Sequence, residues 1–228
     1  AFPLFNVLGY ESSIAIATAM FLVGGPLFTA TPDTQDIFSH WFGRFSRGLV
    51  VIFWPLFALV LAAYSIQNCA LLTGVVFYLL IVLGGLVVAC TWGAVIATVL
   101  RNRWMKLTCW YALVLCSIAS TALYLMNEPP VVAGNAVIGY FAGSIYDEAL
   151  TIPDQLIAYR AWNVVFCLLL LLAVDIVTKR RDQRVVGAAR LTALTCTAIA
   201  FIWMTQSASE LGLWHTRQQI QETLGGSY

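Results

Sequence analysis

The run ALLTGVVFYLLIVLGGLVVACTWGAVIATVL, residues 70–100, decides the fold, because it contains no charged side chain. An α-helix rises about 1.5 Å per residue, and roughly 20 apolar residues cross the hydrocarbon core of a bilayer, which is about 30 Å thick. A helix over the whole run would be about 46 Å long, more than one perpendicular crossing needs. Either the helix is strongly tilted, or Gly84 and Gly85 break it into an interfacial piece and a crossing piece. We favour the break.

The chain as a whole has the composition of a membrane protein. Of its 228 residues, 61% are hydrophobic and 10% are charged, whereas soluble domains are about 45–50% apolar. A formal net charge of +1 leaves no basic surplus, so we expect no nucleic-acid partner. Five further apolar runs have spanning length: 13–30, 49–66, 107–126, 161–178 and 191–211. We therefore expect an all-α fold, a polytopic membrane helix bundle with six transmembrane helices that forms a single membrane domain over residues 1–228.

The basic residues predict how this bundle is oriented. Ten of the twelve Lys and Arg residues lie in the first, third and fifth linkers between the predicted crossings. Cytoplasmic loops of membrane proteins carry an excess of Lys and Arg, and aromatic belts form at both interfaces. Trp104 and Trp110 flank the inner boundary that this arrangement implies. The three basic linkers then face the cytoplasm, both termini are extracytoplasmic, and the expected location is the bacterial inner membrane, with membrane lipids as partners.

Between the first two crossings, residues 33–47 predict a separate surface helix. Its apolar and aromatic side chains recur at helical spacing, and acids near its start can cap it. We expect this helix to lie in the inner interface as an anchor, with Arg44 and Arg47 directed toward anionic head groups.

The outer loop, residues 127–160, mixes glycines, aromatic residues and acids and is the most informative part of the chain. The residues singled out as a clamp or a docking surface are Tyr146, Asp147, Glu148 and Arg160. We expect an acid of the loop, or Asp154, to pair with the arginine and fix the loop on the membrane surface. A divalent-cation or substrate site made by the same acids is the alternative.

Small residues recur at four-residue steps along one face of the long apolar run. They are Gly85, Ala89, Gly93 and Ala97. A stripe of this kind lets two helix backbones approach closely. We expect another helix of the same chain to cover it, rather than a partner chain or a ligand.

Apart from Glu210 at the very end of the sixth, Asp175 is the only acid inside a predicted crossing, and an intramembrane carboxylate is a candidate proton or ion site. It lies about one turn from the cytoplasmic end of its crossing, and Lys179 follows four residues later. An ion pair at this spacing, snorkelling toward the interface, satisfies both charges. We expect this structural pair rather than a proton relay, because no other crossing supplies a titratable partner at mid-membrane.

The chain contains no recognisable catalytic motif. It lacks HExxH, GxSxG and P-loop sequences, and its six cysteines are scattered without a CxxC pair. His40 and His215 fall on opposite sides of the predicted membrane, which excludes a haem bound by two histidines. We expect no enzyme and no metal site, and no residue pattern identifies a cofactor.

Three segments of the chain are similar to sequences of other membrane proteins. They are FNVLGYE at residues 5–11, QNCALLTG at 67–74 and GYFAGSIYDEAL at 139–150, the last followed by Tyr159 and Arg160. In these segments the chain resembles an uncharacterised bacterial family of multipass membrane proteins. In that family the membrane part often precedes an extracytoplasmic domain similar to a peptidase of the MA clan, and residues 211–226 are similar to the helical joint before it. The present residues include none of that peptidase's zinc ligands, so the resemblance implies no hydrolase activity for them.

Together these patterns favour an integral membrane scaffold or anchor subunit that docks or positions partner proteins on the extracytoplasmic side. Two alternatives stay open. One is a solute or ion transport subunit with a broken helix at Gly84 and Gly85. The other is a lipid-, quinone- or pigment-binding subunit of an energy-converting complex, favoured by the aromatic content.

Overall fold

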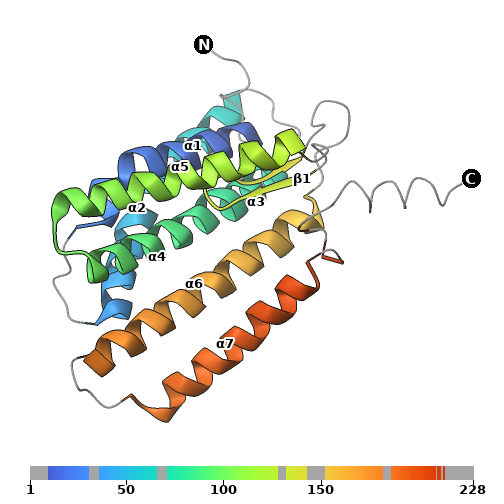
Figure 1. Ribbon diagram of the computed structural model, residues 1–228. Helices are drawn as coiled ribbons and strands as arrows, with labels where there is room; N and C mark the ends of the chain where they lie inside the picture. The colour runs from blue at the N-terminus through green and yellow to red at the C-terminus, as the bar shows by residue number, and fades with distance from the viewer. Residues whose placement is uncertain are drawn as a thin grey trace, which may run out of the picture.

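A computed structural model describes residues 10–30, 36–65, 71–127, 132–142, 152–181, 186–208, 210–211 and 213. The elements are α1 (Tyr10–Phe28), α2 (Ile37–Ser65), α3 (Leu71–Tyr78), the π-helix η2 (Leu79–Leu83), α4 (Gly84–Val99), α5 (Arg103–Asn127), β1 (Val132–Asn135), β2 (Gly139–Ala142), α6 (Asp154–Arg181) and α7 (Ala188–Gln206). Within these residues, six helices are long and apolar enough to cross a membrane. The expected helical bundle is confirmed, with one addition, a two-stranded hairpin between α5 and α6 (Figure 1).

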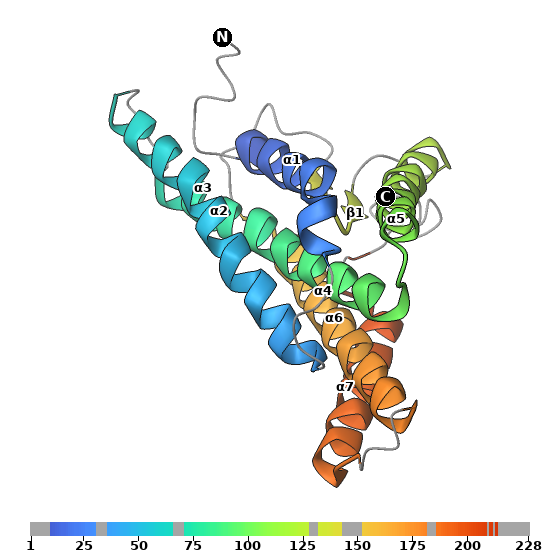
Figure 2. The ribbon, with the colours of Figure 1, turned by 90° about the vertical axis from the view of Figure 1, so that its left-hand side faces the viewer.

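Helix α4 is the centre of the bundle. It packs against α1, α2, α5 and α6. Helices α1 and α5 lie on one side of α4, and α6 with α7 on the other (Figures 1 and 2). Helix α7 packs mainly against α6, and none of its residues is buried.

The predicted break at Gly84 and Gly85 is wrong. Helices α3, η2 and α4 follow one another without interruption from Leu71 to Val99, and Gly84 itself has helical dihedral angles. The irregularity is a π-helical segment instead, in which one extra residue is accommodated without ending the helix. Glycine at these positions serves close packing, because a Cβ on Gly84 would lie 2.9 Å from Cδ of Arg160.

The separate surface helix expected over residues 33–47 is also corrected. The described part of that segment belongs to α2, which continues without a break to Ser65. The chain needs no break here because its polar groups find partners in the bundle. Trp41 Nε1 donates a hydrogen bond to Thr91 Oγ1 at 3.1 Å. Arg44, which we expected to face head groups, is buried and donates to the Ala30 carbonyl.

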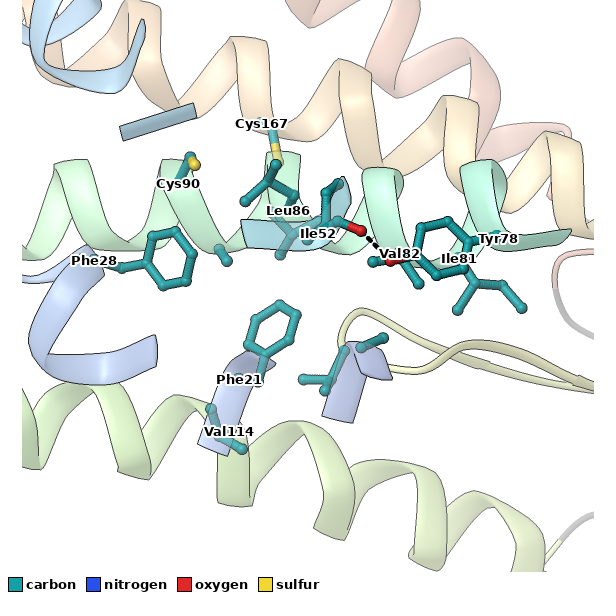
Figure 3. Packing of buried hydrophobic residues seen from close by; sticks show 14 of the residues in the cluster. Phe21, Phe28, Ile52, Tyr78, Ile81, Val82, Leu86, Cys90, Val114 and Cys167 are labelled. Atoms are coloured by element: carbon teal, nitrogen blue, oxygen red, sulfur yellow. Dashed lines mark hydrogen bonds between the residues drawn. The ribbon is translucent and has the colours of Figure 1, made fainter. Parts of the chain in front are cut away.

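Aromatic rings from α1 and α5 fill the core beside α4. Phe21 and Phe28 stack on Trp110 with ring centroids 5.8 and 5.7 Å apart. Trp110 is fully buried and donates from Nε1 to the Phe21 carbonyl at 2.9 Å, so the prediction that it is a belt residue is wrong. On the α2 side, Tyr78 donates from its hydroxyl to the Ile52 carbonyl at 2.5 Å (Figure 3).

The stripe of small residues lies inside this core. Gly85, Ala89, Gly93 and Ala97 are all buried. A Cβ on Gly85 would touch Met20 and Phe21 at 3.5 Å, and a Cβ on Gly93 would overlap the carbonyl group of Phe28. The two glycines of the stripe therefore face α1 of the same chain, as the sequence predicts. At Gly93 the backbones of α1 and α4 are close enough to exclude any side chain.

Candidate functional site

The most site-like region lies where the hairpin inserts between α4, α5 and α6. The two strands pair antiparallel, with Asn135 opposite Gly139. Val137 at the turn is fully buried and belongs to the main core cluster. Gly139 has φ of +96°, a conformation that favours glycine. This turn is thus part of the bundle and not a surface loop.

Asn135 organises the turn. Its Oδ1 accepts hydrogen bonds from the backbone N–H groups of Val137 at 2.8 Å and Ile138 at 3.0 Å. Its Nδ2 donates to the Ser117 carbonyl at 2.9 Å and to Thr121 Oγ1 at 2.7 Å, both on α5. Side chains of Asn and Asp often bond to the backbone two residues further on and so form turns. Here the same amide also ties the turn to α5.

Arg160 ties the hairpin to the other side of the bundle. Its side chain is buried in a slot between Gly84 and Gly139, where a Cβ on either glycine would clash with it. Nη2 donates to the Ile81 carbonyl at 2.8 Å, and Nη1 donates to the Ala136 carbonyl at 3.3 Å. Ile81 lies in the π-helix, and its carbonyl oxygen also accepts a hydrogen bond from the backbone N–H of Gly84. The guanidinium thus links α6, η2 and the hairpin.

The predicted clamp is therefore only partly described. Tyr146, Asp147 and Glu148 lie outside the described residues. Asp154, the third candidate partner, is exposed and makes no ion pair with Arg160 within the described structure. Arg160 is buried, and its described hydrogen-bond partners are backbone carbonyls; its position near the outer head groups stays a prediction.

Arg160→Met should loosen the hairpin. The substitution removes two charge-assisted hydrogen bonds but also removes a buried charge, so global stability should change little. The local effect should be clear, with hydrogen exchange of residues 132–142 about tenfold faster, because one lost bond to a charged group amounts to about 1.5 kcal/mol. Arg160→Lys should not restore slow exchange, because an ammonium lacks the planar fork that spans both carbonyls. Arg180→Met, at the exposed far end of α6, is the control, and equal exchange in all these variants would contradict the assignment.

Beside the hairpin lies a pocket of about 220 Å³. Its walls include Tyr159, Trp162 and Phe166, which recur along one face of α6 and stack in sequence with centroid distances of 6.0 Å. Asn163 lines the pocket and donates from Nδ2 to the Tyr159 carbonyl at 2.9 Å. A row of stacked rings beside an amide can accept a flat molecule that has a polar edge.

A second polar centre lies at the opposite end of α6. Asp175 is buried and pairs with Lys179 at 2.9 Å, the i,i+4 pair that the spacing predicts. It also pairs with Arg190 of α7 at 3.2 Å, which the sequence did not indicate. Lys179 in turn reaches Asp36, just before α2, at 3.4 Å. The carboxylate of Asp175 therefore holds the ends of α6 and α7 together.

Asp175→Asn should weaken this end of the bundle. The substitution leaves Lys179 and Arg190 without their shared counterion, and partial exposure of Arg190 reduces the loss to about 2 kcal/mol. We expect a lower midpoint of thermal unfolding in detergent and faster proteolysis in the linker between α6 and α7. Asp36→Asn, which removes a more exposed partner at 3.4 Å, should change the midpoint by less than half as much. A larger fall in the midpoint for Asp36→Asn than for Asp175→Asn would show that Asp175 is not the central acid.

Sequence reasoning missed the hairpin and its anchors. Gly134, for example, packs directly on the Tyr159 ring, where a Cβ would lie 2.8 Å from Cδ2. The Asn135 side chain and the positive φ of Gly139 form the turn, and an Asn followed within a few residues by Gly is the signal that could have indicated it. No signal in the sequence predicted that Arg160 would donate to a π-helix.

Comparison with known proteins places the chain in no group. No family model, no curated protein and no solved structure matches it. Within the described residues, no group of three or more His, Cys, Asp or Glu side chains could hold a metal ion. The interpretation of function therefore rests on the geometry of this chain.

Proposed function

We propose that this chain is a non-enzymatic scaffold of a bacterial inner membrane, with both termini outside, that docks or positions partner proteins on its extracytoplasmic side. The observation that carries the proposal is the anchored hairpin. Arg160 on α6 and Asn135 on β1 direct their hydrogen bonds to the chain's own backbone and to α5. The connection between α5 and α6 thus has a rigid base, from which the adjacent acids can be presented to a protein partner.

The charge distribution supports a scaffold over a carrier. Long uncharged runs occupy every candidate crossing: residues 12–28, 48–65, 71–99, 107–127, 161–174 and 191–206. Carriers place their substrate sites near the bilayer midplane, commonly at interrupted helices. The helix around Gly84 and Gly85 is continuous, so the feature on which the transport interpretation depended is absent from the described residues.

A photo-crosslinking experiment tests the scaffold. A photoreactive amino acid replaces Tyr146 in the outer loop, and in a second variant it replaces Arg180 at the far end of α6. The proposal predicts a discrete crosslinked protein from position 146 in intact cells and none of that size from position 180. Asp147→Ala combined with Glu148→Ala should abolish the product while the amount of membrane-inserted protein is unchanged. Identical products from both positions, or no dependence on the two acids, would contradict docking through this loop.

The aromatic pocket favours a second candidate, a subunit that binds a quinone or another flat amphiphile. A quinone head group could stack on the rings of Trp162 and Phe166 and accept a hydrogen bond at its edge. Organic extraction of the natively purified protein, followed by mass spectrometry, tests this candidate. A stoichiometric amphiphile that is lost in Trp162→Ala would support it, and a quinone-free, colourless preparation would eliminate it.

A further inference from the structure

The end of α1 and the start of α5 lie at the opposite end of the bundle from the hairpin, at the left in Figure 1, and residues of both line a basic pocket. It has a volume of about 280 Å³ and lies between the end of α1 and the start of α5. Its lining residues are Pro26, Thr29, Ala30, Arg101, Arg103, Lys106 and Leu107. Three of the seven are cations, and none is an acid.

The cations of this pocket lack acidic partners within the described structure. All ion pairs there involve Asp175 or Asp36 at the ends of α2, α6 and α7. Lys106 is 3% exposed as a whole residue and lines the pocket, and a lysine with so little exposure normally has an anion as partner. An unpaired cation that lines a cavity therefore indicates that an anion belongs in the cavity.

Arg44 adds a fourth positive charge next to the pocket. It is 5% exposed and donates to the carbonyl of Ala30, a lining residue. Its Nη1 is buried and has no hydrogen-bond partner, and the charge lies close enough to interact with that of Lys106. Two neighbouring cations repel each other, and an anion in the pocket would neutralise both charges.

The chemistry of the lining matches a phosphate group. Guanidinium and ammonium groups donate charge-assisted hydrogen bonds to phosphate oxygens, and the start of α5 adds the positive end of a helix dipole. Trp104, 75% exposed on the first turn of α5, is suited to the head-group layer. Basic pockets between transmembrane helices on the cytoplasmic side are where acidic lipid head groups bind.

We propose that the pocket between α1 and α5 binds a phosphate-bearing anion through Arg101, Arg103 and Lys106, with Arg44 behind them. An anionic phospholipid of the inner leaflet and a soluble phosphate compound share this chemistry. The site lies at the other end of the molecule from the hairpin, so it does not depend on docking through the outer loop; the choice of the inner leaflet rests on the proposed orientation.

Native mass spectrometry of the purified protein tests the site. The protein in detergent is titrated with phosphatidylglycerol, with phosphatidylcholine carrying the same chains, and separately with inorganic phosphate. Phosphatidylglycerol should bind at least tenfold more tightly than phosphatidylcholine. Its retention in the presence of millimolar inorganic phosphate would assign the site to lipid, whereas displacement would assign it to a soluble phosphate compound.

Two double variants distinguish binding in the pocket from a general attraction of anions to positive charge. Arg101→Gln with Arg103→Gln removes two exposed pocket cations without touching a buried residue, and should raise the Kd of the bound anion about tenfold. Arg47→Gln with Arg180→Gln removes the same charge from exposed positions outside the pocket lining, and should change the Kd less than twofold. Lys106→Gln should weaken binding as much as the first pair if it folds. Equal losses in both double variants, or no preference for either anion over phosphatidylcholine, would overturn the proposal.

Discussion

Replacing Asn135 by Leu should reduce the stability of the protein more than any other single substitution at the hairpin. The apolar side chain is of similar size, but it leaves the amides of Val137 and Ile138 without their acceptor and removes both hydrogen bonds from Nδ2 to α5. Each buried polar group left unsatisfied costs about 1–3 kcal/mol, so we expect a total loss of about 3–5 kcal/mol. In detergent, the midpoint of thermal unfolding measured by size-exclusion chromatography should fall markedly, or the protein should fail to accumulate in the membrane.

Asn163 offers a matched control for this prediction. Both asparagines are 4% exposed, but the described hydrogen bonds of Asn163 stay within its own helix, to the carbonyl and the side chain of Tyr159 one turn earlier. Asn163→Leu should therefore cost less than about 1 kcal/mol. Similar melting curves for the two variants would show that the hydrogen-bond network around Asn135 does not hold the hairpin.

Gly93→Ala should cause the second largest loss of stability. The added methyl group would lie 2.8 Å from both the carbonyl carbon and Cβ of Phe28. Because the methyl group would overlap backbone atoms of Phe28, which cannot rotate away, α1 and α4 must move apart. This movement disrupts the stacking of Phe28 on Trp110. Overpacking of this kind costs about 1–3 kcal/mol, and disturbance of the aromatic core places the expected loss at the upper end. Thermal unfolding in detergent measures it directly.

Gly43→Ala is the control for the added methyl group. Gly43 also lies inside a helix, but a Cβ there meets nothing within 4 Å. Alanine is a better helix former than glycine by about 1 kcal/mol, so this variant should be at least as stable as the parent protein. If Gly93→Ala were also neutral, the close approach of α1 and α4 would not be a feature of the folded protein.

The six helices of spanning length could be predicted from the sequence because the length of each apolar run determines them. The uncharged run at residues 70–100 was sufficient to place the central helix, although not its continuity. The four-residue steps from Gly85 through Ala89 to Gly93 were sufficient for its packing face. The helix ends were less predictable, since α2 extends over residues that were expected to form a separate helix. Burial of Arg44 in the bundle makes this extension possible, and such tertiary contacts are not visible in a local pattern.

The candidate site was less predictable than the fold. Arg160 was identified as an important residue, but its partners were expected to be carboxylates of the outer loop. The partners that the structure describes are backbone carbonyls from η2 and from the hairpin, and two of the expected acids, Asp147 and Glu148, lie outside the described residues. A π-helical segment and a three-residue turn depend on how distant segments pack, and periodicity does not encode that packing.

The central claim is that this chain crosses a membrane and presents the hairpin end of the bundle outside. Single cysteines at Asp154 and Gly187, on a cysteine-free background, test it by labelling with a membrane-impermeant maleimide, because these positions flank the two ends of α6. The account predicts that Asp154→Cys is labelled in intact spheroplasts and that Gly187→Cys is labelled only after permeabilisation. Labelling of both in intact spheroplasts would contradict a crossing by α6, and the reverse pattern would contradict the orientation.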